Sequence, residues 1–484
     1  MRELQLKFIG DPSLIRLFQL LNYIERERTF TVGSLTALTN VTQRTIIKDL
    51  NYLKDYFQGS AEFSSGRRGY QFKETNPEIY KEQKKQLLSN EVLFEIVGNI
   101  FYGELETIEE LAFLYNYSES TLRRLLVQIK PVLAEYDLEL VLNPVNFTGD
   151  EGNLRKFFKD FYYEGEQIPH TLTPPKELHE LVLTTLSGKM GNYEISTGTT
   201  PASFYYTLYI AIERSRQGNK ISLPKNLREI IYHEKDYLLL TYLTDAIKKY
   251  FGVQMTDEEY AWIYLVTICK RPISPIRHEL LFFERFNLWP NISTLSLLYI
   301  QEQGENETEG RAKRAFLNSF FLSRKINDSV SPALNKLMSE ITLYIKTNHL
   351  ESYKHNYRFL LENQTFLAFS KNHLEDIAVS LTLFYDSLLA YYTPMKKIIF
   401  LLEGDHFICQ NIRFNAEQLL GQKHHLIFIP LQNLTTEMLN EKQVDLIVTN
   451  YPPYISDYIL STDYLLINSV PDKEDWQRIL EKAK

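Results

Sequence analysis

Apolar side chains recur at helical spacing near the start of the chain, at Leu14, Leu17, Phe18, Leu21 and Ile24. This period predicts a helix over 13–28, and a second, shorter helix fits 32–39. An Asn-Val turn follows, after which Thr42 caps a third helix that runs to about Phe57. The two glycines in AEFSSGRRGYQF then bracket a hairpin turn. Three helices followed by a hairpin predict a winged helix-turn-helix unit over residues 1–75.

The same order of elements returns further along the chain. An amphipathic helix fits 91–103, a short helix fits 106–115, and Ser118 caps a third helix that Pro131 interrupts. The stretch LELVLNPVNFTG then alternates in polarity and breaks at Asn-Pro, as a second wing hairpin would. This repeat predicts a second helix-turn-helix unit over residues 76–168.

The rest of the chain divides where the spacing of its hydrophobic residues changes. At 484 residues the chain is too long for one core. Helical spacing continues after the second unit, and proline-containing breaks divide it into two helical bundles, 169–283 and 284–393. From Lys396 short β-rich runs alternate with helical segments, which predicts an α/β domain with a mostly parallel sheet over 394–484. The predicted fold class is therefore mainly α and multidomain, with this small α/β domain at the end.

Composition excludes several classes of protein. Hydrophobic residues make up 44% and charged residues 24%, as in a globular protein. We find no secretory leader and no apolar run of the roughly 18 residues that a membrane span needs, so we expect a cytoplasmic protein with no membrane partner. Cys269 and Cys409 match no zinc spacing, and neither a phosphate-binding loop nor a dinucleotide fingerprint occurs. We therefore expect no metal, no cofactor and no enzymatic activity.

Charge is unevenly distributed. The net charge is −8, yet residues 1–75 hold 11 Lys and Arg against 8 Asp and Glu. Residues 76–165 hold 9 Lys and Arg against 16 Asp and Glu. An acidic chain with a mildly basic end suits a protein whose affinity for nucleic acid lies in one part.

The third helix of the first unit has the pattern of a recognition helix. We expect an apolar stripe to bury Ile46, Ile47, Leu50, Leu53 and Phe57. The other face and the helix start then present polar side chains to double-stranded DNA, namely Gln43, Arg44, Thr45 and Lys48, with Tyr52 beside them. Arg67 and Arg68 at the hairpin tip are placed to contact phosphate or the minor groove. The alternative is a three-helix bundle with ordinary surface cations.

The second unit repeats this pattern with less positive charge. Its third helix is expected to bury Leu122, Leu125, Leu126 and Ile129. That leaves four polar side chains near the helix start as candidate DNA contacts: Ser120, Thr121, Arg123 and Arg124. The alternative is a degenerate helix-turn-helix that serves packing alone.

Three further segments carry a resemblance to a known family. They are TGDEGNLRKFFKDFYYE after the second wing, FYYTLYIAIERSRQGNKISLP (204–224) and GVQMTDEEYAWIYLVTI (252–268). With the doubled helix-turn-helix, they resemble the Mga-type virulence regulators of Gram-positive bacteria over essentially the whole chain. The resemblance implies two sugar-phosphotransferase regulation domains and a final domain similar to the IIB subunit of sugar permeases. It also implies a homodimer or higher oligomer whose DNA binding responds to histidine phosphorylation by phosphocarrier proteins.

The chain departs from that pattern at the positions that carry phosphate. Where such regulation domains place their phosphorylated histidines, this chain has Thr207 and Val266, so His355 and His373 in the second bundle are the remaining candidates. A working IIB unit needs a cysteine at the end of its first strand, and Cys409 comes several residues too late. We expect the final domain to serve assembly.

Three classes of function fit these observations to different degrees. A DNA-binding transcription regulator fits the doubled winged unit. The sequence leaves activator and repressor both open, and the resemblance leans toward activation. An RNA-binding antiterminator carries the same type of regulation domain, but its small β-rich RNA-binding domain would replace the helical N-terminal units. An enzyme or phosphocarrier would need the absent cysteine and histidines.

Overall fold

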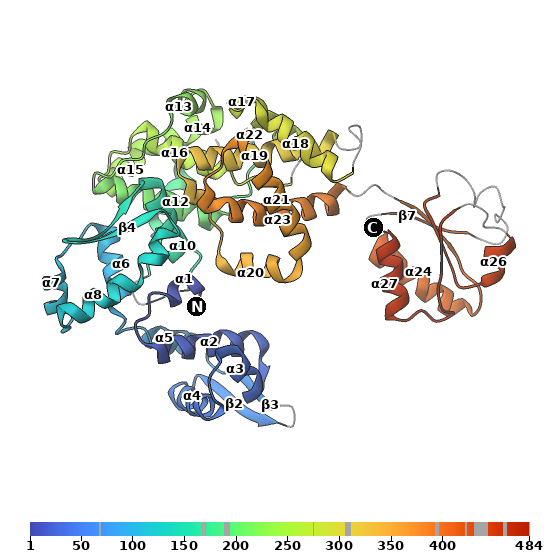
Figure 1. The fold of residues 1–484 in the computed structure, drawn as a ribbon, viewed down its shortest axis with the longest axis horizontal. Helices are drawn as coiled ribbons and strands as arrows, with labels where there is room; N and C mark the ends of the chain where they lie inside the picture. Colours follow the sequence, from blue (N-terminus) through green and yellow to red (C-terminus); the bar gives the residue numbers. More distant parts are fainter. Residues whose placement is uncertain are drawn as a thin grey trace. The chain divides into compact units, whose positions relative to one another are not determined.

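The computed structural model describes residues 1–66, 69–166, 168, 171–187, 194–273, 275–304, 311–392, 396–421, 424–429, 444–457 and 462–483. The chain forms two compact units, Met1–Phe384 and Tyr385–Lys484. Each unit is drawn in Figure 1, coloured along the sequence.

The first winged unit follows the predicted order. After a short helix α1 (Glu3–Leu6), its elements are α2 (Pro12–Glu27), β1 (Thr29–Phe30), α3 (Val32–Thr39), α4 (Gln43–Tyr56), β2 (Ala61–Gly66) and β3 (Gly69–Glu74). The strands form an antiparallel sheet in the order β1-β3-β2, with Gly66 opposite Gly69 at the end of the hairpin. Gly69 has φ 117°, and a Cβ there would lie 2.3 Å from the carbonyl oxygen of Phe30, so this turn requires glycine.

The second unit repeats the first. Its elements are α5 (Pro77–Gln86), α6 (Val92–Tyr102), α7 (Ile108–Leu114), α8 (Glu119–Gln128), α9 (Lys130–Ala134), β4 (Leu138–Leu142) and β5 (Val145–Gly149). As predicted, the third helix of this unit breaks beside Pro131, with α8 ending at Gln128 and α9 following it. The wing hairpin turns at Asn143-Pro144, which is a cis peptide bond.

Local capping explains why both copies fold alike. Thr31 and Thr107 each form a capping box at the second helix. Left-handed Asn40 and Asn116, with φ 54° and 56°, then end that helix. Thr42 and Ser118 cap the third helix in turn. In each of these pairs the second residue lies 76 positions after the first, which gives a register between the two units.

Helix α10 (Glu151–Tyr162) connects the second wing to the helical bundles (Figure 1). Asp150 caps it by accepting the N–H groups of Gly152 and Asn153 at 2.9 and 3.2 Å. Its aromatic side chains are buried in one apolar core that also holds residues of both winged units, from Phe8 to Phe147. The two winged units therefore share a core with α10.

The rest of this compact unit is helical, as predicted. Its helices are α11 (Lys176–Leu186), α12 (Pro201–Arg216), α13 (Lys225–Ile231), α14 (Lys235–Thr241), α15 (Leu243–Phe251), α16 (Asp257–Ile268), α17 (Ile276–Phe286), α18 (Asn291–Glu302), α19 (Arg311–Val330), η1 (Pro332–Asn335), α20 (Ser339–Asn348), α21 (Leu350–Glu362), α22 (Gln364–Leu367), η2 (Lys371–His373) and α23 (Leu374–Tyr392). The boundary predicted at 283 falls inside α17, which packs against α19.

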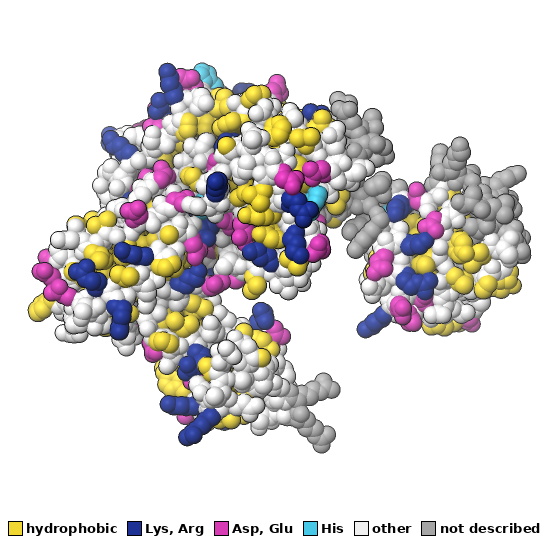
Figure 2. All heavy atoms as spheres, viewed as in Figure 1, with side chains coloured by type: hydrophobic (Ala, Val, Ile, Leu, Met, Phe, Trp, Pro, Cys, Tyr) yellow, Lys and Arg dark blue, Asp and Glu magenta, His cyan; other side chains and the backbone are white. Residues whose placement is uncertain are grey.

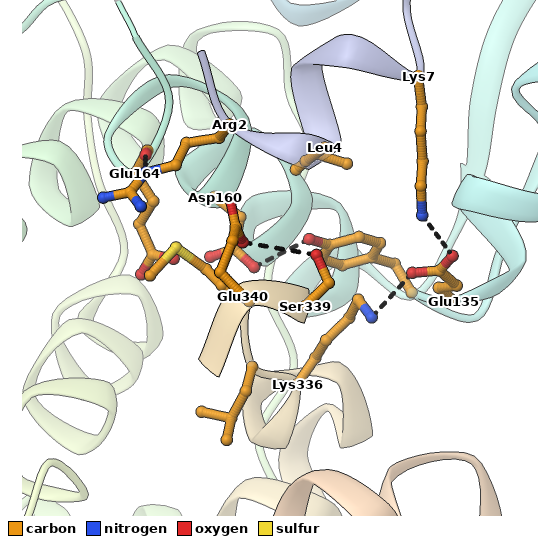
Figure 3. Close-up of a pocket in the computed structure, with 12 residues that line it drawn as sticks. Arg2, Leu4, Lys7, Glu135, Asp160, Glu164, Lys336, Ser339 and Glu340 are labelled. Carbon is orange, nitrogen blue, oxygen red and sulfur yellow. Dashed lines mark hydrogen bonds and ion pairs between the residues drawn. The ribbon is translucent and has the colours of Figure 1, made fainter. Parts of the chain in front are cut away.

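Figure 3 shows one junction within this unit, where three segments far apart in sequence meet. Glu135, next to α9, accepts a hydrogen bond from Lys7 at 3.1 Å and pairs with Lys336 at 3.0 Å. Partial burial alone would raise the pKa of Glu135, but the two lysines hold it below its usual range. These ion pairs attach the second winged unit to the segment after η1.

The C-terminal unit contains the predicted α/β domain. Its elements are β6 (Lys397–Leu401), α24 (His406–Leu420), β7 (His425–Phe428), β8 (Leu446–Thr449), α26 (Pro452–Asp457), β9 (Tyr464–Leu466) and α27 (Lys473–Ala483). All four strands are parallel, in the order β7-β6-β8-β9. Side chains of α24 and α27 pack on one face of the sheet and those of α26 on the other.

Candidate DNA-binding surface

Helix α4 is fixed to the first unit by an apolar stripe and one ion pair. Four of the five residues predicted for the stripe are buried: Ile46, Leu50, Leu53 and Phe57. Beside them, the buried carboxylate of Asp49 accepts two hydrogen bonds from Arg16 on α2, at 2.6 and 3.2 Å. This hydrogen-bonded pairing raises the pKa of Arg16. A bidentate contact of this kind sets the rotation of α4 about its own axis.

The predicted DNA-facing side of α4 is free of carboxylate partners. Gln43, Arg44 and Lys48 are exposed, and Thr45 is half-buried. Within the described residues, neither Arg44 nor Lys48 forms an ion pair, so both cations are available to an external anion. With Tyr52 they border an open groove of about 880 Å³.

One residue of the predicted stripe was misassigned. Ile47 is 46% exposed and does not belong to the core. The register between the units places it at the position of Arg123, which is also exposed. Ile47 therefore lies on the same side of its helix as the candidate DNA contacts, where an apolar side chain can meet a thymine methyl group.

The start of α8 presents the corresponding surface of the second unit. Leu122, Leu126 and Ile129 are buried and Leu125 is half-buried. The hydroxyl of Ser118 lies 3.0 Å from that of Ser120 and 2.8 Å from that of Thr121, so these hydroxyls already bond to one another.

Two exposed arginines complete this surface. Arg123 and Arg124 have no ion pair among the described residues, and Arg124 occupies the position of Lys48 in the register between the units. Figure 2 shows Lys and Arg side chains on the surface of both lobes that hold these helices. Arg67 and Arg68, predicted at the first wing tip, lie outside the described residues.

Polar side chains of α10 hold the DNA-binding units to the helical bundles. The guanidinium of Arg155 is fully buried and donates to both oxygens of Glu259 on α16, at 2.5 and 3.1 Å, and to Glu151 at 2.8 Å. Glu151 also accepts from Arg214 on α12 at 2.7 and 3.0 Å. Burial alone would lower the pKa of Arg155, yet the two carboxylates raise it. The buried Arg155 is thus paired with two carboxylates, and Glu259 depends on it more than Glu151 does, because Arg214 also pairs with Glu151.

The two candidate histidines differ in surroundings. His355 on α21 is half-buried, and its Nε2 lies 2.9 Å from Nε2 of Gln303. His373 is buried, with Nε2 3.1 Å from a carboxylate oxygen of Asp137 and Nδ1 3.5 Å from one of Asp376. Asp137 precedes β4, so His373 contacts the second winged unit. Sequence spacing contains no sign of this contact between distant segments.

The cysteine of the C-terminal unit lies away from the end of its first strand. Strand β6 ends at Leu401, and Cys409 lies in the second turn of α24. Partial burial, with Glu403 and Asp405 nearby, raises the pKa of the Cys409 thiol. This thiol is therefore a weaker nucleophile than an ordinary surface cysteine.

Two other kinds of feature are absent from the described residues. Among them, no helix is both long and apolar enough to cross a membrane. The same residues bring no three His, Cys, Asp or Glu side chains together in a group that could hold a metal ion.

Comparison with known proteins identifies the class. Residues 79–162 match the Mga helix-turn-helix domain, which covers the second winged unit and α10. The resemblance to the Mga type is confirmed by this domain and by homologues named as capsule synthesis positive regulators.

Individual relatives agree with this class. The chain is 20% identical to the capsule synthesis positive regulator AcpB of Bacillus anthracis, over 97% of this chain and 98% of that protein. It is 25% identical to AcpA, a capsule synthesis positive regulator of the same organism, over 46% of this chain and 48% of that protein. Identity to the probable licABCH operon regulator of Bacillus subtilis is 24%, over 49% of this chain and 40% of that protein.

Proposed function

We propose that this chain is a DNA-binding transcription regulator that contacts DNA through α4 and α8. The observation that carries the proposal is the repeat of exposed cations without carboxylate partners, among the described residues, at the start of both helices, Lys48 matching Arg124. Each helix is held by buried apolar side chains, which is how a recognition helix is presented to a major groove. The names of the relatives support a regulator, and those of AcpA and AcpB support activation.

A salt titration of binding to duplex DNA tests the proposal. We expect wild-type affinity to fall steeply with salt, because cations on both helices displace counterions from phosphates. Each phosphate that a side chain neutralises contributes roughly 0.9 to the log–log slope. Arg44→Ala/Lys48→Ala and Arg123→Ala/Arg124→Ala should therefore each reduce that slope by about 2. Ile47→Ala, which removes an apolar side chain, should weaken binding to a specific site and leave the slope unchanged.

A control and two contrary outcomes complete this experiment. Lys225→Ala, whose side chain is 81% exposed on α13, should behave as wild type. An unchanged slope in the α8 variant would reduce the second unit to a packing module, and absence of binding to any duplex at low salt would refute the proposal. In that case RNA is the next ligand to test.

Self-association through the C-terminal unit belongs to the same proposal. Phe407 and Phe414 of α24 lie two turns apart on one face of the helix and are 69% and 64% exposed, so they offer an apolar surface for association. Association would make later DNA contacts intramolecular. Light scattering during the titrations reports the mass, and the mass of a single chain throughout would remove association from the proposal.

We also propose that sugar-phosphotransferase proteins regulate binding by phosphorylating His373. His373 is 1% exposed, so a phosphocarrier reaches Nε2 only when η2 opens away from the second winged unit. A phosphoryl group on Nε2 would then meet the carboxylate of Asp137 and keep the two segments apart. His373→Glu should therefore change DNA affinity severalfold, whereas His373→Gln, which can still donate to Asp137, should resemble wild type. Equal affinities of the two variants would contradict this role. Absence of phosphohistidine after incubation with the phosphocarriers would exclude the modification.

A further inference from the structure

A small recess lies where α10 packs against α12 and α16. It is lined by Lys159, Asp160 and Glu164 from α10 and its C-terminal extension, by Ser203 and Thr207 of α12, and by Lys270 after α16. About 40 Å³ is free for the centres of solvent-sized atoms. That is room for roughly three water-sized groups, so the recess suits a small ligand and excludes a peptide or nucleic acid.

The recess has more positively charged side chains than carboxylates that pair with them. Two other lining cations are neutralised, Arg155 by Glu259 and Lys156 by Asp160, whose oxygens lie 2.5 and 2.6 Å from the lysine nitrogen. Within the described part of the chain, Lys159 and Lys270 have no carboxylate within ion-pair distance. The ammonium of Lys159 donates to the hydroxyl of Thr207 at 2.8 Å.

The surroundings disfavour the charged forms of these two lysines. Burial lowers the pKa of Lys159 to about 7, and repulsion by Lys270 adds to the effect. Burial lowers the pKa of Lys270 to about 8, with repulsion by Lys156 and then by Arg324. Lys270 is exposed and Lys159 is half-buried, and both side chains line the recess. An anion between the two ammonium groups would relieve both effects.

The acidic side chain of the recess does not cancel this surplus. Burial and then Asp160 raise the pKa of Glu164, and even as a carboxylate it balances only one of the two unpaired lysines. On the neighbouring helix α19, the Nε of Arg324 also has no hydrogen-bond partner among the described residues. The local field is therefore positive, which excludes a metal cation as the occupant.

We propose that the recess binds a phosphoryl group, either as inorganic phosphate or as the phosphate end of a small metabolite, between Lys159 and Lys270. Each ammonium offers three donors, and the hydroxyl of Ser203 lines the same space. The hydroxyl of Thr207 already donates to the carbonyl oxygen of Ser203, so it serves only to hold the ammonium of Lys159. A phosphoryl group has three or more acceptor oxygens for these donors, whereas a carboxylate has two. The lining contains no histidine, so the ligand is held without a covalent bond.

Isothermal titration of the full chain with inorganic phosphate, at ionic strength held constant with chloride, tests this site. We expect saturable binding of one phosphate per chain. A parallel titration with glycerol 3-phosphate shows whether the site prefers inorganic phosphate or the phosphate end of a small metabolite. Lys159→Gln and Lys270→Gln should each weaken binding at least tenfold. Lys225→Gln, on an exposed helix face, should bind as wild type.

Thermal unfolding gives a second readout that does not depend on ligand affinity. Removing an uncompensated charge should leave Lys159→Gln and Lys270→Gln at least as stable as wild type without phosphate, and phosphate should then raise the unfolding temperature of the wild type alone. A loss of stability in both variants without ligand would show that the lysines are already satisfied and would overturn the proposal. Equal binding of succinate, or no saturable phosphate binding, would overturn it as well.

Discussion

Arg155→Met is expected to destabilise the larger unit by about 3–5 kcal/mol, because it leaves a buried carboxylate without its cation. Arg155 is the only side chain among the described residues that forms an ion pair with Glu259, which is 1% exposed. Without it, Glu259 keeps only the backbone N–H of Ile221, at 3.1 Å, as a donor among those described. Glu151 is affected less, since Arg214 still pairs with it.

Urea denaturation followed by tryptophan fluorescence measures this loss, because Trp262 lies 4.9 Å from the Arg155 guanidinium. Arg26→Met is the matched control. The Arg26 side chain is 73% exposed and, among the described residues, forms an ion pair only with Glu27. Its loss should therefore change the free energy of unfolding by less than about 1 kcal/mol. Arg155→Met/Glu259→Met removes both charges and should recover a large part of the loss. A double variant as unstable as Arg155→Met would show that packing, and not the unpaired charge, causes the effect.

Structural features that depend on a few neighbouring residues could be predicted from the sequence. Thr42 and Ser118 are recognisable as helix caps because each precedes an amphipathic run, and capping acts within three residues. The break at Pro131 follows from the missing N–H of proline. The four-stranded parallel sheet of the C-terminal unit follows from alternating β-rich and helical runs.

Ile47 shows that helical spacing of apolar residues alone can assign a residue to the wrong face of a helix. Two adjacent isoleucines both fit an apolar stripe, but neighbouring positions on a helix point about 100° apart, so only Ile46 reaches the core. The information was present in the repeat, since the second unit has Arg123 at the matching position.

Contacts between distant segments could not be predicted at all. His373 and Asp137 are 236 positions apart, and Arg155 and Glu259 are 104 apart. Each of these residues, taken alone in the sequence, resembles an ordinary surface charge. Only the folded structure brings the two members of each pair together.

Phe157→Ala is the second substitution with a large expected effect, a loss of about 3–5 kcal/mol from an unfilled cavity. The Phe157 ring is fully buried in α10, with ring centroids of Phe8, Tyr136 and Phe147 at 5.9, 5.4 and 5.5 Å. These rings come from the segment before α2, from the end of α9 and from the second wing. Phe113→Ala, on a side chain that is 88% exposed, should leave stability unchanged.

The Phe157→Ala variant also tests whether the core holds α4 and α8 in a fixed relation. Since one continuous apolar core holds residues of both winged units, Phe157→Ala should speed hydrogen exchange in the core amides of α4 as well as in those of α8. DNA affinity should then fall on warming at a lower temperature than in Phe113→Ala. Faster exchange in α8 alone would mean that the units open separately and that the first winged unit binds DNA as an independent module. Faster exchange in both would mean that α4 and α8 are held in a fixed relation, so the spacing of their contacts on DNA is set by the core around Phe157.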